Sequence, residues 1–295
     1  MSLGVLNNIA AVYAENNLNS TQASLQNTLE QLSSGSRINS GADDAAGLSI
    51  ADGLGAASAA LTQSADNATQ GVGLLQVADG ALSQVTNLLN RAITLATEAS
   101  NGTLSTSQDA AANQEFQSIL AEINNIGTTT TFNGNSVFSG TAVTVYSGDA
   151  TTTGGATDAL TIAALTSASV GDVGGTVAST GTAISYTPGT GEDLSADVLT
   201  SATAAQTALT DVNTAITDVA AQRGYVGSQI NTLNAISNVD STEQENVLSA
   251  QNSIQATDYG QATSNLSKYE ILSQTGISAL AQANSVEQEV TKLLQ

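Results

Sequence analysis

Residues 212–233, VNTAITDVAAQRGYVGSQINTL, place a large side chain on one helix face at alternating steps of four and three residues. This spacing is typical of a heptad seam, the line along which one helix packs against another. The predicted seam positions are Val212, Ile216, Val219, Arg223, Val226, Ile230 and Leu233. Because a single helix cannot cover its own stripe, a partner helix is required.

The first third of the chain supplies a matching stripe. A helix from residue 42 to residue 100 would be roughly 90 Å long at 1.5 Å per residue. Its seam positions are Leu54, Leu61, Val72, Leu75, Leu82 and Leu89. We therefore expect a long antiparallel coiled coil, in which Arg223 pairs with a carboxylate across the interface and fixes the register.

Composition favours extended helical packing and argues against catalysis. The 295 residues include three Phe, one Pro and no Trp, and much of the 41% hydrophobic content is alanine, which buries little area. His and Cys are both absent from the sequence, which removes His-based acid–base catalysis, Cys nucleophiles and most zinc, copper and haem ligation. We expect no catalytic site, no metal and no cofactor.

Charge argues against two further classes of partner. The formal net charge is −21 and only five residues are basic, so the surface repels nucleic-acid phosphates and anionic lipid headgroups. The sequence has no apolar run of about 18 residues, and its N-terminus lacks the basic and apolar regions of a cleaved signal peptide. We expect neither nucleic-acid binding nor membrane insertion.

Between the helical regions lies a segment rich in Thr, Gly and Ser, residues 139–199. Its Val, Ile and Tyr residues favour short strands joined by Gly and Thr turns. Just before it, Asn133-Gly134 is typical of a tight β-hairpin turn. The expected fold is mainly α, with long antiparallel coiled-coil helices from both chain ends and a small β-rich inserted outer domain.

Some short motifs admit both a chemical and a structural interpretation. Adjacent Asp43 and Asp44 could share a proton or hold a divalent cation, although capping of the first turn of a helix is simpler. Gly71 and Gly73 faintly resemble a phosphate loop, but glycines inside a helix more often mark close helix approach. The tyrosines interpreted as packing anchors are Tyr13, Tyr225, Tyr259 and Tyr269.

Both ends of the chain carry apolar residues at helical spacing, which is unusual because termini normally fray. Either the terminal helices bury each other, or they are buried in other copies of the protein. The pattern predicts polymerisation through the ends. The predicted polymerisation residues are Leu3, Leu6, Ile9, Leu18, Leu25, Leu29, Leu32, Ile271, Leu272, Ile277, Leu280, Val286, Val290, Leu293 and Leu294.

Several motifs occur in order at the two ends. The N-terminal ones are LSSG at 32–35, RINS at 37–40, DDAAGL at 43–48 and TFNG at 131–134. The C-terminal ones are DY at 258–259, SNLS at 264–267, ILSQ at 271–274 and LAQAN at 280–284. Together they resemble the N-terminal and C-terminal signatures of bacterial flagellin.

The resemblance implies a structural subunit that polymerises into the flagellar filament for swimming. Residues 1–40 and 257–295 would form the inner filament core, 41–138 and 200–256 an outer helical tube with a β-hairpin, and 139–199 a variable, surface-exposed insertion. A hook–filament junction protein shares the terminal pattern, and a surface adhesin or display module could act through the insertion. Both alternatives stay open at this point.

The resemblance also implies partners and a location. The partners would be further copies of the chain, a flagellin export chaperone on the C-terminal helix, and the filament cap and hook-junction proteins. The location would be the extracellular filament, reached through type III export without a cleaved signal peptide. A vertebrate flagellin-sensing Toll-like receptor would contact Arg91, Leu95 and Glu115.

Two expectations concern the surface. The Ser and Thr residues of the insertion permit O-glycosylation at Ser147, Thr151, Thr152 and Thr153. Ala42 stands where the family commonly has a lysine, which leaves acidic residues without partners. We hypothesise that salt, low pH or bound cations stabilise the filaments by relieving like-charge repulsion.

Overall fold

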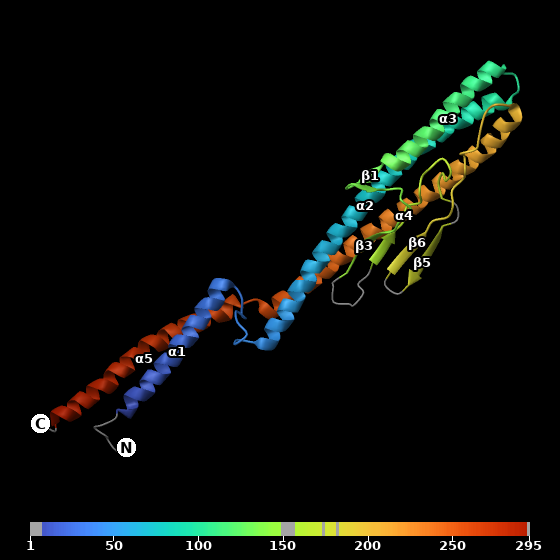
Figure 1. Ribbon diagram of the computed structural model, residues 1–295. Coiled ribbons are helices and arrows are strands. Elements are labelled where there is room, and N and C mark those ends of the chain that lie inside the picture. Colours follow the sequence, from blue (N-terminus) through green and yellow to red (C-terminus); the bar gives the residue numbers. More distant parts are fainter. Residues whose placement is uncertain (1–7, 149–156, 173–174, 181–182, 294–295) are drawn as a thin grey trace. The chain divides into compact units, whose positions relative to one another are not determined.

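The computed structural model describes residues 8–148, 157–172, 175–180 and 183–293 (Figure 1). The chain divides into two compact units, the first formed by residues 1–56 and 247–295 and the second by residues 57–246. The helices are α1 (Ile9–Ser34), α2 (Ala45–Ser100), α3 (Thr106–Thr129), α4 (Ala202–Gln255) and α5 (Tyr259–Leu293). The strands are β1 (Thr131–Phe132), β2 (Asn135–Ser136), β3 (Val143–Tyr146), β4 (Thr157–Leu160), β5 (Thr176–Thr180) and β6 (Ala183–Thr187). The predicted mainly-α fold with a small β-rich part is confirmed.

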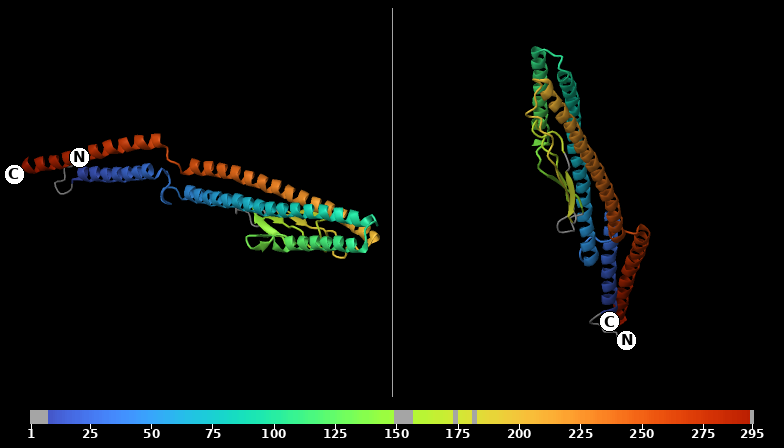
Figure 2. Two further views of the ribbon diagram at one scale, coloured as in Figure 1. Left: turned by 90° about the horizontal axis from the view of Figure 1, so that it is seen from above. Right: turned by 90° about the vertical axis from the view of Figure 1, so that its right-hand side faces the viewer.

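The core of the second unit is the antiparallel pair α2–α4, with α3 and the strands beside it (Figure 2). Along α2, one row of buried residues from Leu61 to Ala99 follows an unbroken heptad spacing and mixes large with small side chains. The row is Leu61, Ser64, Ala68, Gly71, Leu75, Ala78, Leu82, Val85, Leu89, Ala92, Ala96 and Ala99. The small residues leave room for partner side chains, as Gly71 does for Leu233. Of the other predicted α2 positions, Leu54 and Val72 are half-buried.

On α4 the predicted seam is half right. Val212, Val219, Val226 and Leu233 have no exposed surface, as predicted. The alternate positions are Ala215, Gln222 and Gln229, whereas the predicted Ile216, Arg223 and Ile230 are only half-buried. In a heptad the second buried position can lie three or four residues after the first. Both patterns have the same period, so the spacing in the sequence does not show which of the two rows of α4 is buried.

A contact with the middle segment accounts for one of the polar seam positions. Gln222 Nε2 donates to the Ala163 carbonyl oxygen at 3.4 Å. The Tyr225 ring stacks on the Tyr186 ring with centroids 3.7 Å apart, which fits the interpretation of Tyr225 as a packing anchor. Helix α4 is therefore covered on two sides, and large aliphatic residues are not needed at every buried position.

The predicted ion pair across the seam is present. Arg223 Nε lies 2.7 Å from Asp79 Oδ1, and Arg223 Nη2 lies 3.3 Å from Asp79 Oδ2. Both side chains are more than a third exposed, so solvent screening keeps the contribution to stability small. The two-point contact mainly fixes the register of α2 against α4.

The segment of residues 139–199 contributes to the core. Strands β3, β4, β6 and β5 form a four-stranded sheet in that order, with β4 and β6 parallel. The segment has buried apolar side chains at Leu160, Ile162, Leu165, Val170, Leu194 and Leu199. These side chains pack on the helices, and the surface exposure of the segment as a whole stays a prediction. The β1–β2 hairpin turns at Asn133 and Gly134 as predicted.

Gly127 of α3 provides a test of this packing. A Cβ at Gly127 would overlap the backbone carbonyl oxygen of Leu165, whereas a Cβ at Gly80 of α2 would meet nothing within 4 Å. We expect Gly127→Ala to lower the free energy of unfolding by about 1–3 kcal/mol. Gly80→Ala should raise it by about 0.5–1 kcal/mol through helix propensity alone. Chemical denaturation of the two variants distinguishes these effects, and a neutral Gly127→Ala would contradict the close approach.

Candidate assembly surface

In the first unit, α1 and α5 pack side by side and antiparallel. Asn8 Nδ2 donates to the Ala283 carbonyl oxygen at 3.0 Å near one end, and Thr257 N donates to the Gly35 oxygen at 3.1 Å at the other. Between them, Leu18 lies against Gly276. The predicted residues Leu18, Leu25, Leu32 and Leu280 are half-buried. The two terminal helices thus bury each other in part.

This packing leaves the first unit with little core. Among its described residues, the buried hydrophobic side chains are Ile38, Ala51 and Ala262. A stable domain of this size normally buries many large apolar side chains. The α1–α5 pair alone therefore supplies little hydrophobic stabilisation.

Large apolar side chains instead face outward on both terminal helices. Ile9 is 63% exposed, Ile271 62% and Ile277 55%. We call the complete group the outer apolar set: Ile9, Val12, Tyr13, Leu29, Tyr259, Ile271, Leu272, Ile277 and Val286. A helix with apolar residues on several faces belongs in a buried environment. The outer apolar set is therefore the candidate interaction surface of the first unit.

The outer apolar set contains six of the predicted polymerisation residues, namely Ile9, Leu29, Ile271, Leu272, Ile277 and Val286. Leu3, Leu6 and Leu294 lie outside the described residues, as do the side chains of Val290 and Leu293. Tyr13 and Tyr259 are 68% and 57% exposed, so they are not buried anchors in the single chain. Their aromatic character within an apolar helix could have signalled an interface.

The motif residues between α1 and α2 join the two chain ends. Gly35 ends α1 with a positive φ of 73°, which favours glycine. Arg37 N donates to the Gln255 oxygen at 2.7 Å, and Arg37 Nη2 donates to the Ile254 oxygen at 2.7 Å. These bonds satisfy carbonyl groups at the end of α4, where the helix has no further amides to offer.

Asp43 and Asp44 act as local backbone acceptors. Asp43 Oδ2 accepts from the amides of Asn39 and Ser40 at 3.1 and 2.9 Å, and these bonds lower the pKa of Asp43. Asp44 Oδ1 accepts from the Gly47 amide at 2.8 Å in the first turn of α2. The structural interpretation is thus supported, except that Asp43 closes the preceding loop rather than the helix. Within the described ranges, no three His, Cys, Asp or Glu residues are placed to hold a metal ion.

The three predicted receptor contacts lie in the second unit and differ in their exposure. Arg91 and Glu115 are exposed and form a two-point ion pair, with Nε–Oε1 at 2.6 Å and Nη2–Oε2 at 3.0 Å. Leu95 is 4% exposed and lies in the hydrophobic core. The expectation of a Leu95 side-chain contact is therefore wrong, because a partner cannot reach it on this surface.

The glycosylation candidates are only partly described. Ser147 is 5% exposed, so its hydroxyl is inaccessible to a glycosyltransferase, and the prediction of glycosylation there is wrong for the folded chain. Thr151, Thr152 and Thr153 lie outside the described residues.

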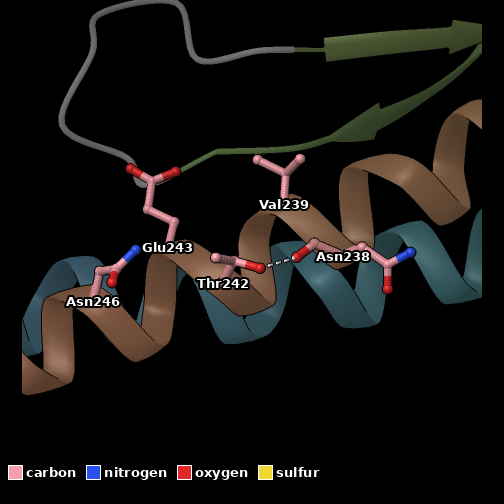
Figure 3. A pocket seen from close by; sticks show the side chains of 5 residues that line it. All are labelled: Asn238, Val239, Thr242, Glu243 and Asn246. Atoms are coloured by element: carbon pink, nitrogen blue, oxygen red, sulfur yellow. Dashed lines mark hydrogen bonds between the residues drawn. The ribbon is translucent and has the colours of Figure 1, made fainter.

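A shallow, open hollow lies on the surface of α4 (Figure 3). Its lining consists of Asn238, Val239, Thr242, Glu243 and Asn246, and Thr242 Oγ1 donates to the Asn238 carbonyl oxygen at 2.9 Å. Val239, one of these lining residues, is 62% exposed. A single carboxylate with amides and a hydroxyl does not make an acid–base pair or a nucleophile with its base.

These features define a class of protein: a subunit built on long helices whose terminal pair exposes large apolar side chains. Among the described residues, no helix combines the length and the apolar character needed to cross a membrane. The outer apolar set is the surface feature that fits this class.

Comparison with known proteins identifies the family. Residues 5–143 match the bacterial flagellin N-terminal helical region, and residues 209–294 match the bacterial flagellin C-terminal helical region. A flagellin of Halalkalibacterium halodurans is 32% identical over 98% of both chains. One of Listeria monocytogenes is 31% identical over 97% of this chain and 98% of its own. The crystal structure of Bacillus cereus flagellin is similar with a TM-score of 0.46 and 26% identity, covering 59% of this chain and 88% of that one.

The chain belongs to the bacterial flagellin family. It is a structural subunit of the flagellar filament, the extracellular polymer used for swimming, and it self-polymerises. The resemblance inferred from the sequence motifs is confirmed.

The carboxylate at the start of α2 gives a test of the capping interpretation. Asp44→Ala should destabilise the first turn of α2 by about 1 kcal/mol, because the Gly47 amide loses its acceptor. Asp44→Asn should change the stability of this turn by only about 0.3 kcal/mol or less, because the side-chain oxygen of Asn can still accept from the Gly47 amide. Hydrogen exchange of the Gly47 amide measures both. A protective effect of Mg²⁺ or Ca²⁺ that vanishes in Asp44→Asn would favour a cation site instead.

Proposed function

We propose that copies of this chain polymerise by burying the outer apolar set of α1 and α5 against one another. The observation that carries this proposal is the exposure of Ile9, Ile271 and Ile277 on helices that have almost no core of their own. In this arrangement residues 1–40 and 257–295 line the inner filament core. Residues 41–138 and 200–256 form the surrounding tube, and the outer face of residues 139–199 points away from the axis.

The energetic scale supports this assignment. Full burial of one isoleucine side chain is favourable by about 1.5–3 kcal/mol, and each 1.4 kcal/mol changes an equilibrium constant about tenfold. Several such residues per subunit are enough to drive assembly even after the entropy of ordering the helices is subtracted. Polar substitution of one or two of them should therefore have a large effect on the polymer and a small one on the monomer.

We expect Ile271→Ser and Ile277→Ser each to raise the critical concentration for polymerisation about tenfold or more. The matched control is Gln274→Ser, which places the same residue type at an exposed position of α5 without removing an apolar contact. Sedimentation after seeded assembly gives the critical concentration, and circular dichroism reports the helix content of the monomer. If Ile271→Ser and Gln274→Ser had the same critical concentration, the proposal that the outer apolar set forms the interface would be wrong.

The same exposed surface supports the partners that the family resemblance implies. We propose that an export chaperone covers the apolar face of α5 before assembly, and that the cap and hook-junction proteins contact the chain ends in the growing filament. Export through the flagellar type III apparatus, without a cleaved signal peptide, belongs to the same proposal. For the Toll-like receptor, the proposal is restricted to the exposed Arg91–Glu115 pair.

Like-charge repulsion opposes assembly in this proposal. The net charge is −21 per subunit, and Arg91 and Arg223 already pair within the chain. Neighbouring subunits therefore meet with a strong excess of negative charge, which salt screens.

Raising NaCl from about 10 mM to about 500 mM shortens the screening length from roughly 30 Å to below 8 Å. We expect the critical concentration to fall several-fold over this range, roughly 3–10-fold. Light scattering during assembly measures it. A critical concentration that stays constant or rises with salt would show that repulsion between subunits does not limit assembly.

A further inference from the structure

Four carboxyl groups lie close to one another where the loop of residues 192–199 meets α4. Glu192 and Asp197 belong to the loop, and Asp211 and Asp218 belong to α4. We call this group the acidic joint. It lies wholly within the second unit.

Two carboxyl groups of this unit are buried. Asp218 of the acidic joint and Asp158 of β4 are each 2% exposed. Within the described ranges, both carboxyl oxygens of Asp158 and Oδ2 of Asp218 find no donor. A buried carboxylate without a donor is costly, whereas the neutral acid is much less so. Burial accordingly raises the pKa of Asp158 and of Asp218.

Asp197 and Asp211 form a carboxyl–carboxyl contact. Asp197 Oδ2 is buried and has no donor among the described residues, while the Asp211 carboxyl approaches within hydrogen-bonding reach. Two carboxylates are both acceptors, so the contact becomes a hydrogen bond only when one of them carries a proton. Burial, followed by the charge and contact of Asp211, raises the pKa of Asp197 to about 6.

This contact lies at a point where the loop is tied to the helices. Gln117 Nε2 of α3 donates to the Asp197 carbonyl oxygen at 2.6 Å, and the Leu199 amide donates to Asn113 Oδ1 at 2.8 Å. Leu194 and Leu199 on either side are fully buried. Movement at Asp197 would therefore disturb the packing of the loop on both α3 and α4.

No basic group relieves the negative charge of the acidic joint. Every charged group that acts on Glu192, Asp197 or Asp218 is itself acidic, including Asp193 of the loop and Asp172 of the segment. The side chains that α3 offers to the loop, Gln117 and Asn113, are neutral. In the described part of the chain these carboxyls are not arranged in threes that could chelate a metal ion. The proton is thus the species that suits the site.

We propose that the acidic joint is a proton-operated clamp: Asp197 holds a proton against the Asp211 carboxyl, and loss of that proton loosens the loop of residues 192–199 from α3 and α4. The clamp is a property of the folded subunit and does not depend on the assembly surface on α1 and α5.

The direction of the pH dependence follows from the raised pKa. A group whose pKa is higher in the docked state than in the open state stabilises docking fully below its ordinary value, 3.8 for Asp197. That stabilisation is lost as the pH rises through about 6, the docked-state value. Docking should therefore weaken about tenfold per pH unit between pH 4 and pH 6 and level off above that range.

Hydrogen exchange of the Leu194 and Leu199 amides in the full-length monomer tests the clamp. Their protection factors should fall by about tenfold to a hundredfold between pH 4 and pH 7. In Asp197→Asn the amide donates to Asp211 at every pH, so protection at pH 7 should exceed that of the unmodified chain about tenfold or more. At pH 4 the two proteins should agree.

The matched control is Asp193→Asn, which removes the same charge from the same loop at an exposed position. It should keep the pH dependence of the unmodified chain. Three results would each overturn the proposal: protection that does not change with pH, full loss of protection in Asp197→Asn, or equal flattening by Asp193→Asn. The last would assign the effect to overall charge. Titration of carboxyl ¹³C resonances gives an independent readout. An Asp197 pKa near its ordinary value would contradict a proton held between Asp197 and Asp211.

Discussion

Apolar surface that one chain cannot cover is the constraint on which the architecture depends. The second unit solves it internally, because the Leu-rich positions of α2 face α4 and the sheet segment closes a further side. The first unit holds α1 and α5 with only the adjoining ends of α2 and α4. Its outer apolar set is left exposed in the single chain. In the proposed polymer, other copies would supply the missing burial, and assembly would complete the fold of these helices.

Side-chain size explains how so few large residues suffice. The chain contains three Phe and no Trp, and Phe116 is the one aromatic among the largest fully buried side chains of the described residues. Alternation of Leu with Ala, Gly and Ser along α2 lets neighbouring side chains interlock over a long line of contact rather than in a thick core. Such a line tolerates polar residues where another element supplies a partner, as Ala163 does for Gln222.

The sequence predicts helices and turns well here because their determinants are local. Gly35 at a positive φ and the Asn133-Gly134 turn act through backbone conformation, which the residues themselves decide. The wrong seam positions, Ile216 and Ile230, have a tertiary cause. Which row of α4 faces inward depends on a segment some 60 residues earlier in the chain, such as Ala163 beside Gln222, and heptad spacing carries no information about it.

The same argument explains why the assembly surface was predictable and the acidic joint was not. Apolar residues near both termini are visible in the sequence, and their exposure follows once only two helices are available to cover them. Asp197 and Asp211 belong to a sequence with 26 acidic residues, and neither has a distinctive motif. They become notable only because folding brings two carboxyls together away from any cation. A chain this acidic keeps most of its charge in solvent, so the few carboxyls that folding buries are the ones whose protonation can change the structure.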